Sequence, residues 1–140
     1  EAIDMLHEEG LDNVFARHKR HAEATRAAVE AWGLEVLCTV PEHRSPVLTA
    51  VMVPEGCSAD HFRSVTLQNY DMSLGNGLSK VADRVFRIGH LGDFNDLMLC
   101  GTLSGVEMGL RDAGIPYKAG GVQAALDVLG RKFDAERAAA

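Results

Sequence analysis

The sequence is short of the features that define several protein classes. Its apolar runs reach only a few residues, as in 50–53, whereas a membrane-spanning helix needs about 20. Cys38, Cys57 and Cys100 are odd in number and form no CxxC pair, so neither a disulfide framework nor a zinc ribbon is predicted. Positive charge is also scarce, since 14 Lys and Arg against 20 Asp and Glu give a net charge of −6. Nucleic acid and anionic membranes attract basic surfaces, so we expect neither as a partner.

What is present is typical of one globular domain. The chain has 140 residues, of which 46% are apolar and 24% charged, enough to bury a core without covalent crosslinks. The unpaired thiols favour a reducing compartment, and we predict a cytoplasmic location. We expect no signal peptide in these residues. A helical pattern is already under way at Glu1, which predicts that the chain is cut from something longer.

Apolar residues at spacings of three and four predict a long amphipathic helix that stops at Gly33. Its inner face consists of Leu11, Val14, Phe15, His18, Ala22, Thr25, Val29 and Trp32. A shorter helix over 2–9 precedes it, with a bend at Gly10. Further helices are expected over 58–69, 93–113 and 122–133, with Ser58 and Asp93 as the N-caps of the first two.

Three glycines lie on one side of the helix expected over 93–113. Gly101, Gly105 and Gly109 are four residues apart, and each costs about 1 kcal/mol relative to alanine in a helix. The spacing therefore predicts that another backbone packs closely against this side. A membrane GxxxG interpretation fails because charged residues flank and interrupt the segment.

Four short stretches predict β-strands, at 35–40, 47–53, 71–74 and 85–88. A turn is expected at Gly75–Gly77, whose residues tolerate positive φ. Because the strands cluster between helices, the predicted fold is α+β. We expect a small, at least partly antiparallel sheet with helices packed on one face.

The segment Gly75–Lys80 is glycine-rich but fits no phosphate-binding motif. It lacks the spacing of a Walker A loop, and it leads to a strand rather than to the helix that a dinucleotide-binding turn requires. Lys80 would need burial or a nearby cation to act as a nucleophile, whereas Asp83 and Arg84 beside it are typical of solvent. We interpret the segment as a structured turn or a mobile loop near a site, and Lys80 as a surface residue.

Two further groups of reactive side chains are interpreted as structural. His18 and His21 are one helical turn apart, but no third ligand is placed near them, so we predict no metal site. Cys57 and His61 resemble a nucleophile and its base, yet no third residue orients them.

Arg87 is the candidate binding residue. It stands in a strand with apolar neighbours, followed at once by glycines in Val85–Gly92. Because strand residues alternate between faces, Phe86 and Ile88 take one face and Arg87 the other. A guanidinium presents a planar fork that matches a carboxylate with two hydrogen bonds. Two interpretations stay open here: an ion pair within the domain, and a site for an acidic ligand.

Residues 69–82 and 85–92 closely resemble the C-terminal region of serine–glyoxylate aminotransferases. These enzymes stand with the alanine–glyoxylate and serine–pyruvate aminotransferases in class V of the fold-type I pyridoxal-phosphate (PLP) enzymes. The similarity extends to 8–18 and 105–108, and so covers nearly the whole chain. Its most specific piece is the RIGHLG sequence that begins at Arg87.

The resemblance implies that residues 1–140 are the C-terminal small domain, with 1–10 as the tail of the segment that leads in from a large domain. In this family the arginine of the RIG sequence pairs with the substrate carboxylate, and that role falls on Arg87. The family's Schiff-base lysine and other PLP-binding residues belong to the large domain. The resemblance therefore predicts no catalytic or cofactor-binding residue in this chain, and no activity for it alone.

The implied activity is a PLP-dependent transfer of the amino group of serine or alanine to glyoxylate. The products are glycine and either hydroxypyruvate or pyruvate. The expected partners are the chain's own large domain and, in a homodimer, a second copy. Two alternatives stay open: a stand-alone module that binds small carboxylates, and an assembly domain that docks through the Gly101 side of its helix.

Overall fold

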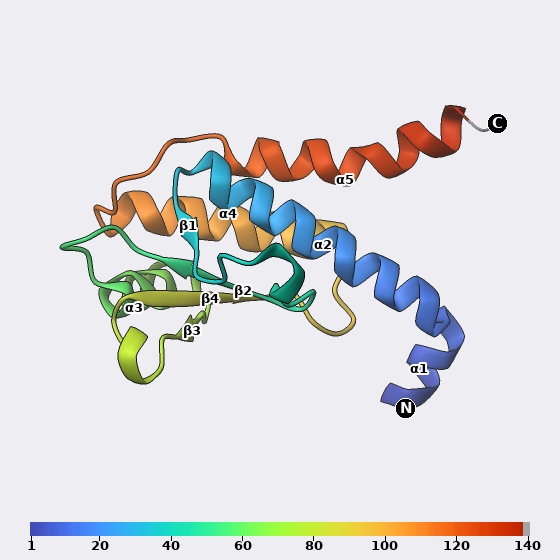
Figure 1. Cartoon of the computed structure of the whole chain (residues 1–140), viewed down its shortest axis with the longest axis horizontal. Coiled ribbons are helices and arrows are strands. Elements are labelled where there is room, and N and C mark those ends of the chain that lie inside the picture. Colours follow the sequence, from blue (N-terminus) through green and yellow to red (C-terminus); the bar gives the residue numbers. More distant parts are fainter. Residues whose placement is uncertain (139–140) are drawn as a thin grey trace.

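A computed structural model describes residues 1–138 of the protein, with side chains through residue 131. Figure 1 shows the long helices α2, α4 and α5 running along one side of a small sheet, with α1 beyond its end. The helices are α1 (Ala2–Glu9), α2 (Leu11–Ala31), α3 (Ala59–Tyr70), α4 (Asp96–Asp112) and α5 (Gly121–Ala138). The strands are β1 (Glu35–Val36), β2 (Leu48–Met52), β3 (Gly75–Asn76) and β4 (Val85–Gly89). Two short 3₁₀ helices are η1 (Pro41–His43) and η2 (Ser79–Val81).

The four strands form one antiparallel sheet in the order β1-β2-β4-β3. Val51 of β2 pairs with Phe86 of β4, and both side chains are fully buried in the core. Phe62 of α3 packs on Phe86, with ring centroids 4.6 Å apart. The core also takes in Leu103 of α4, so the helices cover the Phe86 face. The predicted α+β fold, with helices on one face of an antiparallel sheet, is confirmed.

The junction of α2, α4 and α5 is organised by Glu107. Its carboxylate accepts a hydrogen bond from Trp32 Nε1 at 2.8 Å and from the N–H groups of Gly120 and Val122, both at 3.2 Å. The latter two lie at the start of α5, where unpaired backbone donors need an acceptor. Burial raises the pKa of Glu107, but these hydrogen bonds outweigh it, so the net pKa is lowered.

The glycines of α4 pack closely against side chains rather than against a backbone. A Cβ at Gly109 would lie 2.2 Å from Thr66 Cγ2, and one at Gly105 would lie 2.9 Å from Met72 Sδ. Gly101 has no neighbour within 4 Å among the described residues. The prediction of close packing is therefore right at two of the three positions, and wrong about the packing partner.

Three predicted elements differ from the structure. The strand predicted over 35–40 is shortened to the two residues of β1, Glu35–Val36. The strand predicted over 71–74 is wrong, because Asp71 ends α3 in the left-handed conformation with φ 51°, and pairing begins only at the predicted turn glycine, Gly75. The N-cap predicted at Asp93 is also wrong. Asn95 caps α4, with its side chain accepting from the Met98 N–H, because the loop after β4 continues two residues further.

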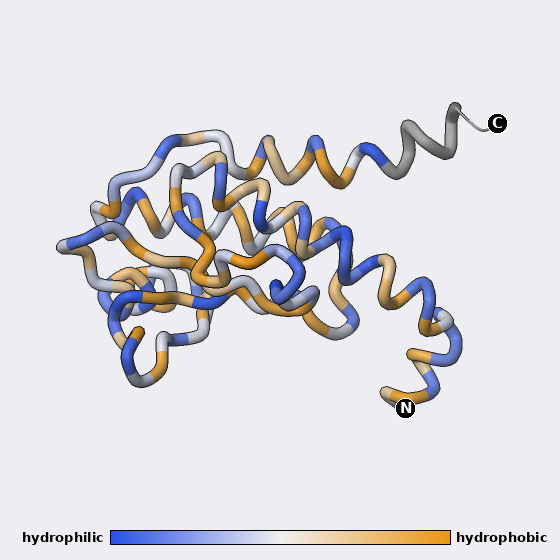
Figure 2. The backbone as a smooth tube through the Cα atoms, viewed as in Figure 1, coloured by the Kyte–Doolittle hydropathy of each residue, from blue (hydrophilic) through white to orange (hydrophobic). Residues whose placement is uncertain are grey.

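The inner face predicted for the long helix is buried over most of its length, but not at its start. Val14 is buried, whereas Leu11 is 47% and Phe15 64% exposed. Figure 2 shows hydrophobic residues recurring along α1 and α2 in the part that extends past the sheet. No described element covers Phe15 there, so the pattern is apolar without being enclosed. Among the described residues, no helix has the length and apolar content to cross a membrane.

Candidate functional site

Arg87 lies in the middle of β4, on the sheet face opposite to the core. It pairs with Ala50 of β2 on one side and with Gly75 of β3 on the other. Paired residues of antiparallel strands point to the same face, so the guanidinium shares its face with a methyl group and with a residue that has no side chain. The strand alternation predicted for Arg87 is confirmed. The sheet thus presents one half-buried cation in an apolar frame.

The guanidinium of Arg87 has no acidic partner among the residues that the structure describes. Its Nε is buried and forms no hydrogen bond, and no ion pair involves this side chain. Burying a charged donor without a partner is costly, and a carboxylate that accepts from two guanidinium nitrogens removes that cost. Of the two interpretations of Arg87, the internal ion pair is therefore not found.

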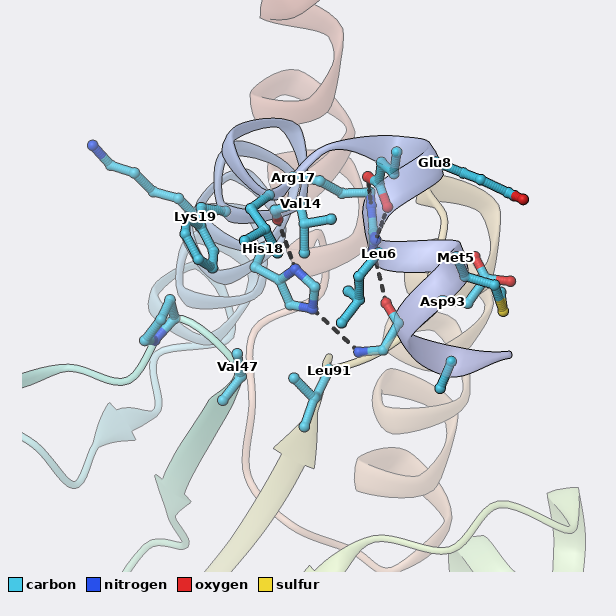
Figure 3. Close-up of a pocket in the computed structure, with 16 residues that line it drawn as sticks. Met5, Leu6, Glu8, Val14, Arg17, His18, Lys19, Val47, Leu91 and Asp93 are labelled. Carbon is cyan, nitrogen blue, oxygen red and sulfur yellow. Dashed lines mark hydrogen bonds and ion pairs between the residues drawn. The ribbon is translucent and has the colours of Figure 1, made fainter.

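The segment after β4 is held by two residues of α2, as Figure 3 shows. His18 Nε2 accepts a hydrogen bond from the Gly92 N–H at 3.1 Å, and its Nδ1 lies 2.7 Å from the Val14 carbonyl oxygen. This geometry requires a neutral imidazole with its proton on Nδ1. Arg17 donates through one nitrogen to the carbonyl oxygens of Gly92 and Phe94, at 2.8 and 3.0 Å. The two side chains therefore fix the exit of the strand that carries Arg87.

A cavity of about 1120 Å³ lies beside this contact, between α1, the start of α2 and the segment after β4. Its apolar lining includes Leu6 and Phe15. Of its basic residues, Arg17 is already engaged and Lys19 is exposed. The Nε and second terminal nitrogen of Arg17 donate to both carboxylate oxygens of Glu9, at 2.7 and 2.6 Å. This pairing lowers the pKa of Glu9. The cavity thus differs from the Arg87 face, because its guanidinium already has a carboxylate partner.

Two buried histidines lie near β4, and burial lowers the pKa of both. His90 is fully buried, and its pKa is lowered to about 4, chiefly by desolvation. Its Nε2 lies 3.1 Å from Thr49 Oγ1 on the core side. His21 is buried too, and desolvation lowers its pKa although Asp96, 2.8 Å from its Nε2, acts in the opposite direction.

The other candidate residues from the sequence show no sign of a ligand-binding role like the one considered for Arg87. Lys80 is exposed on η2, as predicted, and Cys57 packs against the hydrophobic core. His18 and His21 each use a ring nitrogen in a hydrogen bond, with Gly92 and Asp96 respectively. Within the described part of the chain, no group of three His, Cys, Asp or Glu side chains is placed to hold a metal ion.

Sequence reasoning missed two features of the site. The contact of His18 and Arg17 with Gly92 joins residues about 75 positions apart, and no local pattern signals it. The contact of Gly75 with Arg87 was also missed, because an Asn-flanked glycine favours a turn. The sequence offers only a glycine twelve positions before a strand arginine, and this spacing by itself does not predict that the two residues touch.

No known protein-family model matches the sequence. A serine–glyoxylate aminotransferase of Arabidopsis thaliana is 52% identical over 129 residues, which make up 91% of this chain and 32% of that protein. An L-aspartate–glyoxylate aminotransferase of Paracoccus denitrificans is 49% identical over 118 residues, or 84% of this chain and 30% of that protein. The solved pyridoxamine–pyruvate aminotransferase of Mesorhizobium loti superposes with a TM-score of 0.86 and 30% identity. That match covers 93% of this chain and 34% of the solved one.

The fold and the sequence together define the class, because both match aminotransferases over most of this chain. Within that class the chain belongs with the serine–glyoxylate aminotransferases and their relatives, which confirms the resemblance found in the sequence. It spans about a third of the length of the curated relatives it matches.

Proposed function

We propose that this chain is the substrate-carboxylate-binding small domain of a PLP-dependent aminotransferase, and that Arg87 binds the carboxylate. The enzyme would transfer the amino group of serine or alanine to glyoxylate and form glycine. In this proposal residues 1–140 make up the C-terminal domain, and a large domain of the same polypeptide completes the active site.

The observation that carries the proposal is the unpaired guanidinium on β4. Arg87 is half-buried between Ala50 and Gly75, and its Nε lacks any hydrogen-bond partner. Glyoxylate consists of little more than an aldehyde and a carboxylate, so an enzyme that accepts it needs a cation for the acid group. A forked pair fixes the orientation of the acid as well as its position, which places the reacting carbon.

The described residues do not fit a site for PLP. The candidate lysine of the glycine-rich segment, Lys80, is exposed, whereas a lysine that forms a Schiff base needs a lowered pKa through burial or a neighbouring cation. We therefore assign no cofactor contact to this chain, and the proposal leaves PLP to residues outside it. Homodimer formation and a cytoplasmic location stay predictions.

The choice of amino donor is the finer part of the proposal. Similar proteins carry names that specify serine and L-aspartate as donors for glyoxylate. Serine is favoured here by the higher identity, 52% against 49%, and by the three serine–glyoxylate enzymes among the relatives. The Arg87 pair does not separate these donors, because each of them brings an α-carboxylate.

The test is Arg87→Ala in the complete aminotransferase polypeptide. Removing one member of a charge-assisted pair costs roughly 2–5 kcal/mol, so we expect kcat/KM for both serine and glyoxylate to fall about 30- to 4000-fold. Arg87→Lys should recover little of the kcat/KM lost in Arg87→Ala, because an ammonium group cannot form two parallel hydrogen bonds to a carboxylate.

Arg84→Ala is the matched control, because it removes an exposed arginine three positions earlier in the chain. We expect its steady-state kinetics with both substrates to equal those of the unmodified enzyme. Unchanged kcat/KM in Arg87→Ala would rule out the carboxylate role. An equal loss of kcat/KM in both variants would show that the effect comes from the change in overall charge and not from carboxylate binding by Arg87.

A further inference from the structure

We propose that Gly75 is a positioning residue for Arg87: its missing side chain leaves the space in which the guanidinium lies. This inference rests on the proposed carboxylate role of Arg87, and it adds a second residue that determines how well the acid is bound. Gly75 pairs with Arg87 across β3 and β4, so the two residues share one face of the sheet.

The geometry leaves little room for a side chain at position 75. A Cβ built on Gly75 would lie 3.0 Å from Arg87 Cβ, 3.0 Å from its Nε and 3.5 Å from its Cζ. Directly paired strand residues ordinarily keep their Cβ atoms about 4.5–5.5 Å apart. Even a methyl group would therefore push on the root of the Arg87 side chain and on the guanidinium together.

Backbone conformation does not explain this glycine. Gly75 is not among the glycines with positive φ, so an L-residue could adopt its conformation. Glycine in a strand is a disadvantage, and it often marks a close approach by another group. Gly77 is different, because a Cβ there would lie 2.0 Å from the Val81 carbonyl oxygen and would clash with the backbone itself. Only at position 75 is the space taken by the binding residue.

The strand that carries Gly75 is held in place from α3. Arg63 Nε donates to the carbonyl oxygen of Leu74 at 2.8 Å, and Leu74 is buried in the core. β3 therefore cannot move away freely to admit a larger residue, and the displacement falls on the Arg87 side chain. Since the Arg87 Nε is already buried without a partner, the guanidinium depends on this placement to meet the acid.

The experiment compares Gly75→Ala, Arg87→Ala and the double variant in the complete aminotransferase polypeptide. A Cβ contact of 3.0 Å requires the Arg87 side chain to shift by a few tenths of an ångström, and a misplacement of about 1 Å at a binding group can cost about 100-fold in rate. We therefore expect Gly75→Ala to lower kcat/KM for glyoxylate and serine about 3- to 10-fold, mainly through KM. In the Arg87→Ala background the same substitution should have almost no further effect, because no guanidinium is left to displace.

Gly101→Ala is the control for the substitution itself, because a methyl group there has no described neighbour within 4 Å. It should leave KM unchanged, and thermal unfolding of each variant should show a folded protein. Full activity in Gly75→Ala together with a loss in Arg87→Ala would overturn the positioning role and leave the proposed function standing. An undiminished loss from Gly75→Ala in the Arg87→Ala background would also overturn it. No loss in Arg87→Ala would instead remove the proposed function.

Discussion

The charge state and binding capacity of single residues in this protein depend on whether their polar groups have hydrogen-bond partners. Arg17 and His18 find theirs in the segment after β4, whereas three buried nitrogens have none among the described residues: His21 Nδ1, Arg87 Nε and His90 Nδ1. For a histidine the consequence is a neutral ring, because desolvation disfavours the imidazolium. An arginine stays charged, so a buried guanidinium nitrogen without a partner is stabilised when an anion binds it.

The burial of His90 predicts an acid-sensitive fold. Its pKa is about 4 in the folded protein and near 6.5 when solvated, so the unfolded chain binds a proton more readily between these values. The free energy of unfolding should therefore decrease as the pH falls from 6.5 towards 4, with a contribution from His90 of about 2 kcal/mol between pH 7 and pH 5.

Urea unfolding of the protein and of His90→Gln at pH 7 and pH 5 measures this contribution. The variant should lose less stability on acidification than the parent protein. His43→Gln, which removes an exposed histidine, controls for the loss of a histidine as such. Equal losses in the parent and His90→Gln would contradict the assignment.

At the scale of elements, contacts between helices depend on where small residues lie. Gly109 lets α4 approach Thr66 and Phe62 of α3, whereas Gly101, two turns earlier on the same side, faces open space. The sequence pattern treats these two glycines alike. Their neighbours in three dimensions make one necessary for packing and the other only a weak point of the helix.

Alanine at the two positions should therefore shift stability in opposite directions. Gly109→Ala would force a methyl group into the contact with Thr66, and overpacking of this kind costs about 1–3 kcal/mol. Gly101→Ala should gain up to about 1 kcal/mol from helix propensity. Thermal and urea unfolding of both variants give the sign, and destabilisation by Gly101→Ala would show that this side of α4 is covered in solution.

At the scale of the whole molecule, the chain has an enclosed core, and the proposed carboxylate site lies on the opposite face of the sheet. The core draws on four helices and the sheet, with Trp32, Phe62 and Phe86 almost or fully buried. By contrast, Arg87 faces away from that core and lacks an acid, and no described residue fits a PLP-binding lysine. The curated aminotransferase relatives are about three times as long as this chain.

The 140-residue chain alone should therefore bind glyoxylate and serine too weakly to measure. A single forked pair at a half-exposed site supplies little net affinity once the loss of ligand freedom is counted. Isothermal calorimetry at millimolar ligand, with circular dichroism to establish that the chain is folded, tests this expectation. Saturable binding that Arg87→Ala abolishes would favour a stand-alone carboxylate-binding module instead.

Much of the architecture follows from local patterns. The strand alternation around Arg87 predicted its face correctly, and the spacing of apolar residues located α2 because helices repeat every 3.6 residues. Such patterns fail where a glycine is needed to make space for a neighbouring side chain rather than for its own backbone conformation. Gly75 therefore suggested a turn, although it is a strand residue whose space the Arg87 side chain occupies.

The sequence by itself determined the α+β class, the helices on one face and the side of the sheet on which Arg87 lies. These depend on periodicities of two and 3.6 residues, which are properties of neighbouring positions. Only the tertiary structure decided that Gly75 makes room for Arg87 and that His18 and Arg17 hold the end of its strand at Gly92. Those relations join distant positions, because strand register and helix docking, rather than local preference, bring them into contact.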